Sequence, residues 1–257
     1  MDRTLTRREV LTGCAVAASA GLAGCASGEL TASATVADEL NADGVTSVTV
    51  DAINGDITVQ EEQRQSVAVD GQKRVPSEED LEGVSLETRH EGDTLVLATD
   101  HQDQQDDGWL PSFGPNSEVN LDITVPESLS TVAVGTTNGD VEAEGLEATL
   151  DLDTTNGDID VRGHRGVARI VTTNGEVSLG LETGADVTAE STNGDVDIGV
   201  PSSMAAQFSL QTTNGDLSVE GIDGLSVGDT DSLETVTGDG THEVRCETTN
   251  GDITISS

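Results

Sequence analysis

The sequence contains very few aromatic residues and almost no lysine. Tyrosine is absent, one tryptophan and two phenylalanines are the only aromatic residues, and Lys73 is the only lysine. Eleven basic residues stand against 49 acidic ones, so the formal net charge of the 257 residues is −38. Such a charge repels nucleic acid and anionic lipid headgroups, and both are therefore poor partners for this chain.

Other absences limit the chemistry that the chain can perform. The three cysteines, Cys14, Cys25 and Cys246, stand in unlike contexts and predict no disulfide framework. No apolar run reaches the roughly 18 to 20 residues that span a bilayer. The sequence has no nucleophile elbow, phosphate-binding loop, HExxH motif or paired CxxC motif. We therefore expect a protein that is not an enzyme and needs no cofactor.

The acidity of the chain has two interpretations. High charge with few aromatic residues is typical of disordered segments. The apolar residues are periodic, however, which indicates a folded core. In 1 M salt the screening length is roughly 3 Å, so surface charges repel one another only weakly. The composition resembles that of halophilic proteins from salt-loving archaea, which are acidic and fold in concentrated salt.

The first 24 residues predict an export signal. Arg7 and Arg8 precede a short, weakly apolar run rich in alanine and glycine, which resembles a twin-arginine signal peptide. The run ends in LAGC, which resembles the lipobox of secreted lipoproteins and predicts lipid attachment at Cys25. A plain signal peptide with a chance cysteine is the alternative. We expect residues 25–44 to be a flexible tether that holds the protein at the outer face of the cytoplasmic membrane.

An Asn-Gly dipeptide followed by an acidic residue recurs along the chain. In every copy, the residues six and four positions before the asparagine and three and five positions after it are apolar. This period of two predicts a strand, a turn and a second strand, each with one buried face. Asparagine and glycine suit the positive φ that we expect at such a turn. The turn-forming asparagines are Asn54, Asn138, Asn156, Asn174, Asn193, Asn214 and Asn250.

Two all-β architectures fit this pattern. In a β-solenoid, similar to a parallel β-helix, each unit of 18–21 residues is one coil, and the asparagine side chains can form amide ladders. In an antiparallel hairpin meander or sandwich, each Asn-Gly closes a hairpin. The near-identical TTNGD corners favour the solenoid. We expect an N-terminal β region over residues 45–130 with a polar loop at 100–117, and a repeat domain over 131–257, in which residues 237–239 form a degenerate or inserted turn.

The repeat units also resemble a known family. TTNGDVEAEG, TTNGDIDVRG, TTNGEVSLG and TTNGDLSVEG are similar to the "putative adhesin" β-strand-repeat family, a domain of unassigned function. The resemblance covers roughly residues 45–257. It implies a β-helix-like body and no known catalytic residues.

The acidic residue two positions after each asparagine is a candidate cation ligand. In a solenoid these carboxylates would form a ladder, and oxygen-rich sites suit Ca²⁺ or Mg²⁺. The GGxGxD spacing of calcium-binding β-rolls is absent, however. The favoured alternative is that aspartate suits the turn and salt screens its charge. The candidates are Asp140, Asp158, Glu176, Asp195, Asp216 and Asp252.

Three further features have alternative interpretations. Arg162, His164, Arg165 and Arg169 form the only basic cluster, and they either line a lyase groove or, as we favour, balance acidic residues of neighbouring coils. The loop at 100–117 contains Trp109 and Phe113 and is either a polar surface loop, as we favour, or an aromatic tip that contacts a sugar or a partner surface. Cys246 occupies an apolar position of the repeat, which predicts a buried thiol.

The leading functional hypothesis is a cell-surface, lipid-anchored scaffold or adhesin-like binding module without catalytic activity. Its expected partners are the membrane, through the lipid, and a surface protein or polysaccharide. The alternative is a β-helical enzyme that acts on envelope polysaccharide.

Overall fold

The computed structural model describes residues 30–101, 117–222 and 230–257. The predicted export signal, Cys25 and the aromatic residues Trp109 and Phe113 lie outside these residues. The prediction of a flexible tether over residues 25–44 is wrong for residues 32–41, because they form a strand that pairs with residues 66–75 and contributes Leu40 to the core. The described chain is built from β-strands, with one short 3-10 helix, η1 (Glu78–Gly83). No helix in these ranges combines the length and the apolar character needed to cross a membrane.

The first of two sheets, sheet A, has ten strands. From β7 to β17 its neighbouring strands are parallel, whereas β4 is antiparallel to both β1 and β7. In spatial order they are β1 (Ala32–Asn41), β4 (Ser66–Val75), β7 (Glu118–Pro126), β3 (Ile57–Glu62), β9 (Val141–Glu144), β11 (Ile159–His164), β13 (Val177–Leu181), β15 (Val196–Gly199), β20 (Ile253–Ser256) and β17 (Leu217–Glu220).

Sheet B also has ten strands, and it is capped at both edges by an antiparallel strand. The strands between the caps are parallel to their neighbours. In spatial order they are β18 (Ser232–Val236), β16 (Ala206–Asn214), β19 (His242–Asn250), β14 (Val187–Asn193), β12 (Ala168–Asn174), β10 (Thr149–Asn156), β8 (Thr131–Asn138), β2 (Ser47–Asp51), β6 (Thr94–His101) and β5 (Val84–Glu91).

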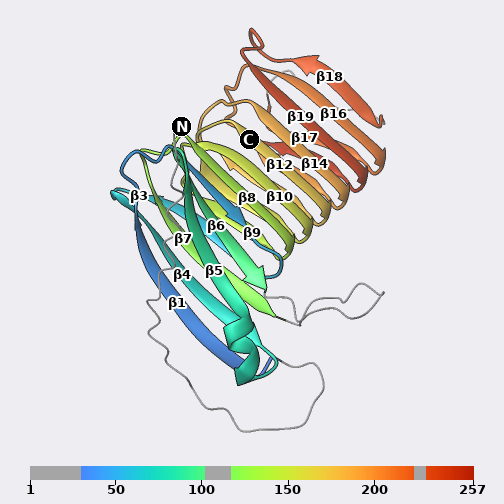
Figure 1. Cartoon of the computed structure of the whole chain (residues 1–257). Coiled ribbons are helices and arrows are strands. Elements are labelled where there is room, and N and C mark those ends of the chain that lie inside the picture. Colours follow the sequence, from blue (N-terminus) through green and yellow to red (C-terminus); the bar gives the residue numbers. More distant parts are fainter. Residues whose placement is uncertain (1–29, 102–116, 223–229) are drawn as a thin grey trace, which may run out of the picture.

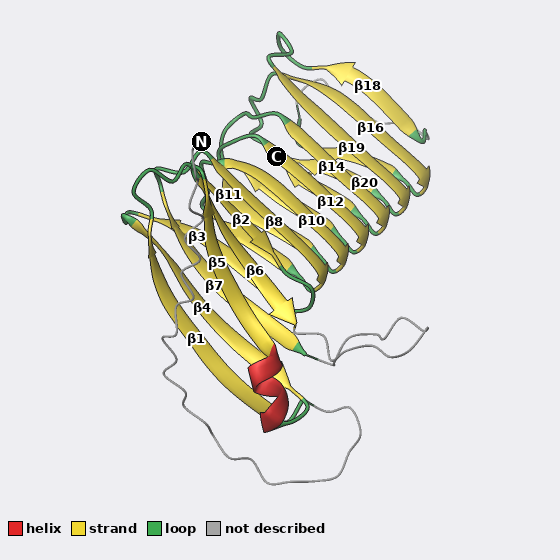
Figure 2. Ribbon diagram, in the orientation of Figure 1, coloured by secondary structure: helices red, strands yellow, loops and turns green. Residues whose placement is uncertain are grey.

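Each coil of the Asn-Gly repeat consists of one strand from sheet B, an Asn-Gly turn and one strand from sheet A (Figure 1). Equivalent residues of neighbouring coils pair in register, such as Leu150 with Ala168 and Asn156 with Asn174. The solenoid prediction is therefore confirmed for the repeat, and the hairpin-meander alternative is wrong, because the strands on either side of each turn belong to different sheets. Antiparallel pairing is confined to strands at the sheet edges, with η1 at the same end of the molecule as β1 and β5 (Figure 2).

The coils do not stack in the order of the sequence. The last coil, β19–β20, lies between β14–β15 and β16–β17, and the first, β2–β3, lies between β6–β7 and β8–β9. The two sheets continue across position 130 without a break. At the predicted degenerate or inserted turn, residues 238–239 form a turn that connects the antiparallel cap β18 to β19, so it is an inserted turn and adds no coil.

The core lies between the two sheets. At the four apolar positions of all seven repeat units, every side chain is buried except that of Val219, which is partly buried against the core. Cys246 is 1% exposed, and burial raises the pKa of its thiol to about 12. The prediction of a buried thiol is thus confirmed.

Candidate functional site

The seven turn asparagines form one continuous amide ladder along an edge of the solenoid. Each Nδ2 group donates to the Oδ1 atom of the preceding asparagine, at 2.7 to 2.9 Å, in the spatial order 54, 138, 156, 174, 193, 250, 214. No described residue other than glycine has a positive φ, so the prediction that asparagine supplies this conformation is wrong. Asparagine is required for its amide, which can donate and accept along the stack.

The turn glycines are required because neighbouring backbones pass very close to one another. A Cβ atom at Gly157 would lie 2.0 Å from the carbonyl oxygen of Gly139, and the other turn glycines meet similar contacts. Gly55 also has a φ of +129°, which side chains rarely adopt. The glycine thus allows coils to approach to strand-pairing distance at the corner.

The acidic residues after the glycines form a second ladder. The backbone N–H of Asp56 donates to Oδ1 of Asn120, and the same contact repeats from coil to coil at 2.7 to 3.0 Å. Within the described chain, the ladder is interrupted once, because the N–H of Asp195 does not donate to the Glu176 carboxylate. Burial and the nearby Asp197 carboxylate raise the pKa of Glu176. Asn120 was not recognised from the sequence because it follows the long loop instead of an Asn-Gly turn.

This geometry gives most of the acidic residues a structural use, since the carboxylates of Asp56, Asp140, Asp158, Asp195 and Asp252 each accept a backbone N–H from a neighbouring turn. No group of three or more His, Cys, Asp or Glu residues is arranged to hold a metal ion within residues 30–101, 117–222 and 230–257. Cation binding to the ladder stays a prediction, which calorimetry with Ca²⁺ in molar salt would test.

A row of buried hydroxyl groups was missed in the sequence. The residue two positions before the turn asparagine points inward and donates to the glycine carbonyl of a neighbouring coil at 2.9 to 3.2 Å. The repeated TT of TTNGD carried this signal, because a period of two places its first threonine on the buried face. The donors are Thr154, Thr172, Ser191, Thr212 and Thr248.

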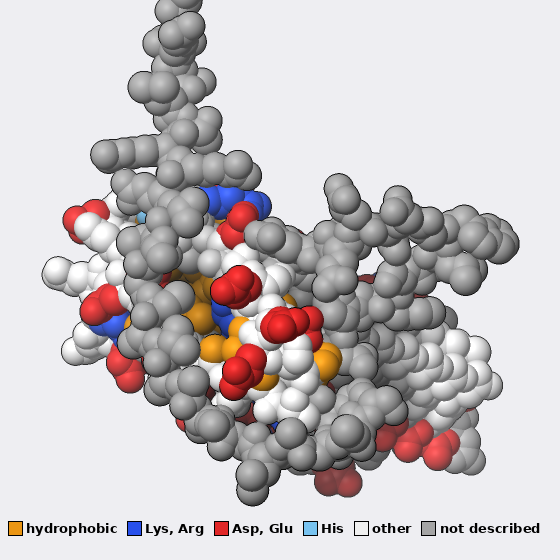
Figure 3. All heavy atoms as spheres, turned by 60° about the horizontal axis from the view of Figure 1, so that its bottom comes forward, with side chains coloured by type: hydrophobic (Ala, Val, Ile, Leu, Met, Phe, Trp, Pro, Cys, Tyr) orange, Lys and Arg blue, Asp and Glu red, His pale blue; other side chains and the backbone are white. Residues whose placement is uncertain are grey.

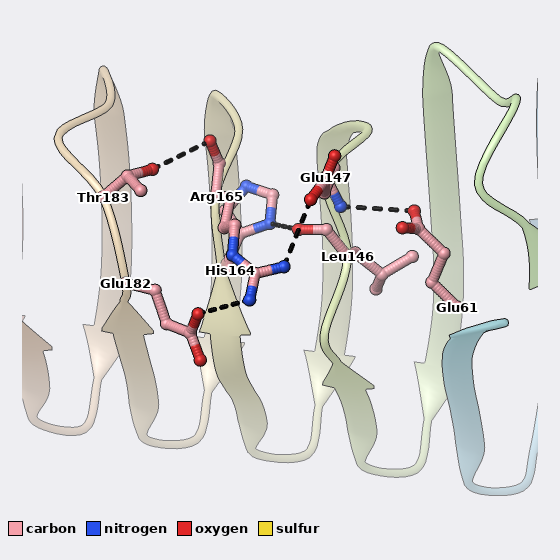
Figure 4. Close-up of polar contacts among 7 residues, drawn as sticks. All are labelled: Glu61, Leu146, Glu147, His164, Arg165, Glu182 and Thr183. Atoms are coloured by element: carbon pink, nitrogen blue, oxygen red, sulfur yellow. Dashed lines mark hydrogen bonds and ion pairs between the residues drawn. The ribbon is translucent and has the colours of Figure 1, made fainter. Parts of the chain in front are cut away.

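The basic cluster is divided between the two sheets and the corner that joins them. Arg165 lies at the corner, where it pairs with Glu147 at 3.2 Å and with Glu182 at 2.5 Å, one from each neighbouring coil (Figure 4). Arg169, on the outer face of sheet B, pairs with Asp151 at 2.9 Å. These contacts confirm for Arg165 and Arg169 the prediction that the cluster balances acidic residues across coils, whereas Arg162 pairs with Asp160 of its own strand.

His164 is fully buried at the same corner. Its Nδ1 atom lies 2.8 Å from the carbonyl oxygen of Leu146 and its Nε2 atom 3.3 Å from that of Val167. Burial lowers the pKa of the imidazole, and these carbonyl contacts oppose the shift only in part. The ring is therefore enclosed by backbone and is not open to a substrate (Figure 4).

A groove of about 690 Å³ crosses the outer face of sheet A beside Arg162. It passes over five neighbouring strands, β11, β13, β15, β20 and β17. Glycines and hydroxyl side chains contribute to its lining, together with several carboxylates and the guanidinium of Arg162. The polar and small lining residues are Asp160, Arg162, Gly163, Ser178, Gly180, Glu182, Asp197, Gly199, Glu220, Thr254 and Ser256.

The remaining described surface is strongly acidic. Figure 3 shows carboxylate side chains spread over one face, with few basic side chains among them. In the described ranges, only Ile53, Val167 and Val236 are large hydrophobic residues with exposed side chains. A partner would therefore meet polar groups over most of this surface.

Comparison with known proteins gives one family match. The model of the Toastrack DUF4097 family matches residues 23–256. No curated protein matches the chain at a significant level.

Several solved structures are similar at low identity. A "putative cell adhesion protein" from Clostridium sporogenes is 13% identical, with a TM-score of 0.49 over 87% of this chain and 99% of the other. A "putative adhesin" from Bacteroides fragilis is 15% identical, with a TM-score of 0.38 over 86% and 96%. A "putative lipid binding protein" from Parabacteroides distasonis is 9% identical, with a TM-score of 0.34 over 87% and 96%.

Proposed function

This chain belongs to the Toastrack DUF4097 family, and we propose that it is a non-catalytic binding module, held by a lipid at Cys25 on the outer face of the membrane. The groove on sheet A is the observation that carries the proposal. It crosses five strands, and at the usual strand spacing this makes it roughly 20 Å long. Such a groove suits an extended chain that runs along the solenoid.

We propose that the ligand is an uncharged polysaccharide. Carboxylates of Asp160 and Asp197, the guanidinium of Arg162 and hydroxyls such as that of Ser178 can all hydrogen-bond to sugar hydroxyl groups. The excess of carboxylates disfavours an acidic polymer. In molar salt long-range attraction is screened, and hydrogen bonds at short distance supply more of the specificity.

Blocking the groove tests this proposal. The Ser178→Trp variant places a large side chain on the outer face of β13, within the groove. Thr188→Trp, on the outer face of β14 in sheet B, is the matched control. We expect binding of neutral polysaccharides, measured by calorimetry in molar salt, to disappear in Ser178→Trp and to persist in Thr188→Trp. Equal loss in both variants, or stronger binding of uronate polymers, would contradict it.

The lipid anchor is tested separately in cells. Cys25→Ala should move the protein from the membrane fraction to the medium, because only the cysteine thiol can form the thioether to the lipid. Cys14→Ala, within the predicted signal peptide, is the control and should leave the protein in the membrane fraction. Replacing Arg7 and Arg8 by lysine should retain the precursor inside the cell.

The second candidate function is a polysaccharide-acting enzyme, because the groove lies beside an arginine. The Arg162 side chain is 62% exposed and pairs with Asp160. Arg162→Ala and the control Arg169→Ala, on the other sheet, should be assayed for cleavage of uronate polymers. Cleavage by the native chain that is lost only in Arg162→Ala would establish the enzyme. No cleavage by the native chain would favour the binding module.

A further inference from the structure

The backbone N–H groups of the turn glycines differ along the stack in whether they have a hydrogen-bond acceptor. In six of the seven turns this N–H donates to the backbone carbonyl of the asparagine in the next coil, at 2.8 to 3.1 Å. The bond runs, for example, from Gly55 to Asn138 and from Gly251 to Asn214. These six amides are therefore engaged in the ladder that joins the coils.

Asn214 occupies the last described turn of the stack, and no described coil lies beyond its glycine. In the described part of the chain, the N–H of Gly215 has no acceptor. The Asn214 side chain is exposed and donates to Oδ1 of Asn250 at 2.9 Å and to the carbonyl of Thr249 at 3.3 Å. Among the described residues, no other asparagine donates to the Oδ1 atom of Asn214.

We propose that Asn214 is a site of spontaneous deamidation. The backbone nitrogen of Gly215 attacks Cγ of Asn214 and loses its proton to water, forming a cyclic succinimide. The side-chain nitrogen takes up a proton and leaves as ammonia. Water then opens the ring, giving aspartate or isoaspartate at position 214. The net reaction consumes one water and releases one ammonia, with no oxidation or reduction.

Hydrogen bonding explains why the other sites are protected. For Asn156, cyclisation breaks four hydrogen bonds. Its Nδ2 group donates two of them, its Oδ1 atom accepts the third, and the N–H of Gly157 donates the fourth. For Asn214, only the two Nδ2 bonds break. Each bond that must be broken raises the barrier, so we expect Asn214 to react roughly tenfold faster or more.

Asn54 is the matched internal control because it lies at the opposite end of the same ladder. It accepts one bond from Asn138, and its glycine N–H is bonded at 2.8 Å. Each of these two end asparagines thus has a side chain bonded to only one other asparagine of the ladder. Among the described residues, however, only Asn214 is followed by a glycine whose attacking backbone nitrogen has no hydrogen-bond acceptor.

The full chain should be incubated in molar salt at mildly alkaline pH and digested, and all seven sites quantified by mass spectrometry with isoaspartate-specific labelling. We expect product to accumulate first at position 214. Asn214→Gln should remove this early product, whereas Asn54→Gln should leave it unchanged. In denaturant, where the ladder is absent, the seven rates should converge. Equal rates in the folded chain, or faster reaction at Asn54, would overturn the proposal.

Discussion

Within each TTNGD turn, the side chains meet separate needs of closely stacked backbones. The first threonine donates to a neighbouring glycine carbonyl, the asparagine extends the amide ladder and the aspartate accepts a backbone N–H. Glycine leaves space for the carbonyl of the adjacent coil. Replacing any of them leaves a different polar group without its partner or produces a steric clash.

The threonine row provides a paired test at the residue scale. Thr172 donates to Gly157 at 3.1 Å, whereas the buried hydroxyl of Thr136 has no partner among the residues that the structure describes. Thr172→Val should lower the free energy of unfolding by about 1 kcal/mol, because it leaves the carbonyl unpaired. Thr136→Val should cost nothing or stabilise slightly. Denaturant unfolding in molar salt measures both, and an equal loss would show that the bond contributes little.

His164 should make stability depend on pH. Because burial lowers the pKa of the imidazole in the folded state, the unfolded chain binds a proton first as the pH falls below about 6.5. The free energy of unfolding should therefore decrease between pH 7.5 and 5.5, by at most about 1.4 kcal/mol per pH unit. Denaturant midpoints measure this slope. His164→Gln should remove it, and an unchanged slope would exclude His164 as its source.

At the scale of the strand and coil, spacing along the chain hides the true neighbours. Asn156 and Asn174 are 18 residues apart and stack directly, whereas Asn193 and Asn214 are 21 apart and have another coil between them. The few extra residues between Asn193 and Asn214 let the chain skip one strand position, a distance of about 4.8 Å, before it forms the next coil. The C-terminal coil then fills the gap, pairing with β14 and β16.

Removing β19–β20 tests whether this gap is required. We expect a chain that ends at Thr241 to stack β16 directly on β14, because the turn sequences are nearly identical and the connection is long enough. Hydrogen exchange should then show both strands still protected, with an overall loss of stability from the missing coil. Loss of protection in β14 and β16 would show instead that β19 is an obligatory spacer.

At the scale of the whole molecule, the net charge of −38 opposes a compact fold. The surface cations that the structure describes are mostly engaged in ion pairs with acidic side chains, which neutralises only a small part of that charge. Mobile salt ions must therefore supply the rest of the screening.

Folding should accordingly depend on salt concentration. Far-ultraviolet circular dichroism should show β structure in molar salt and its loss on dilution to about 0.01 M, where the screening length grows to roughly 30 Å. Returning the salt should restore the signal if unfolding is reversible. Equal β content at both concentrations would disprove the halophilic interpretation.

The sequence by itself determined which side chains face the core and where each coil turns. Both follow from a period of two, which is a local property of a strand, so the burial of Cys246 and the asparagine ladder were predictable. The acidic ladder was foreseen only as a row of carboxylates, and its use as an acceptor of backbone N–H groups depends on contacts between coils.

Only the tertiary structure decided which coils are neighbours. Identical turns pair equally well with one another, so local pattern cannot distinguish consecutive stacking from insertion of the first and last coils. Likewise, the groove beside Arg162 forms where strands distant in the sequence lie side by side in sheet A. The N–H of Gly215 lacks an acceptor in the described chain because β17 is the last strand of that sheet. The repeat thus specifies each corner, whereas long-range strand pairing places Asn214, not Asn250, at the end of the ladder.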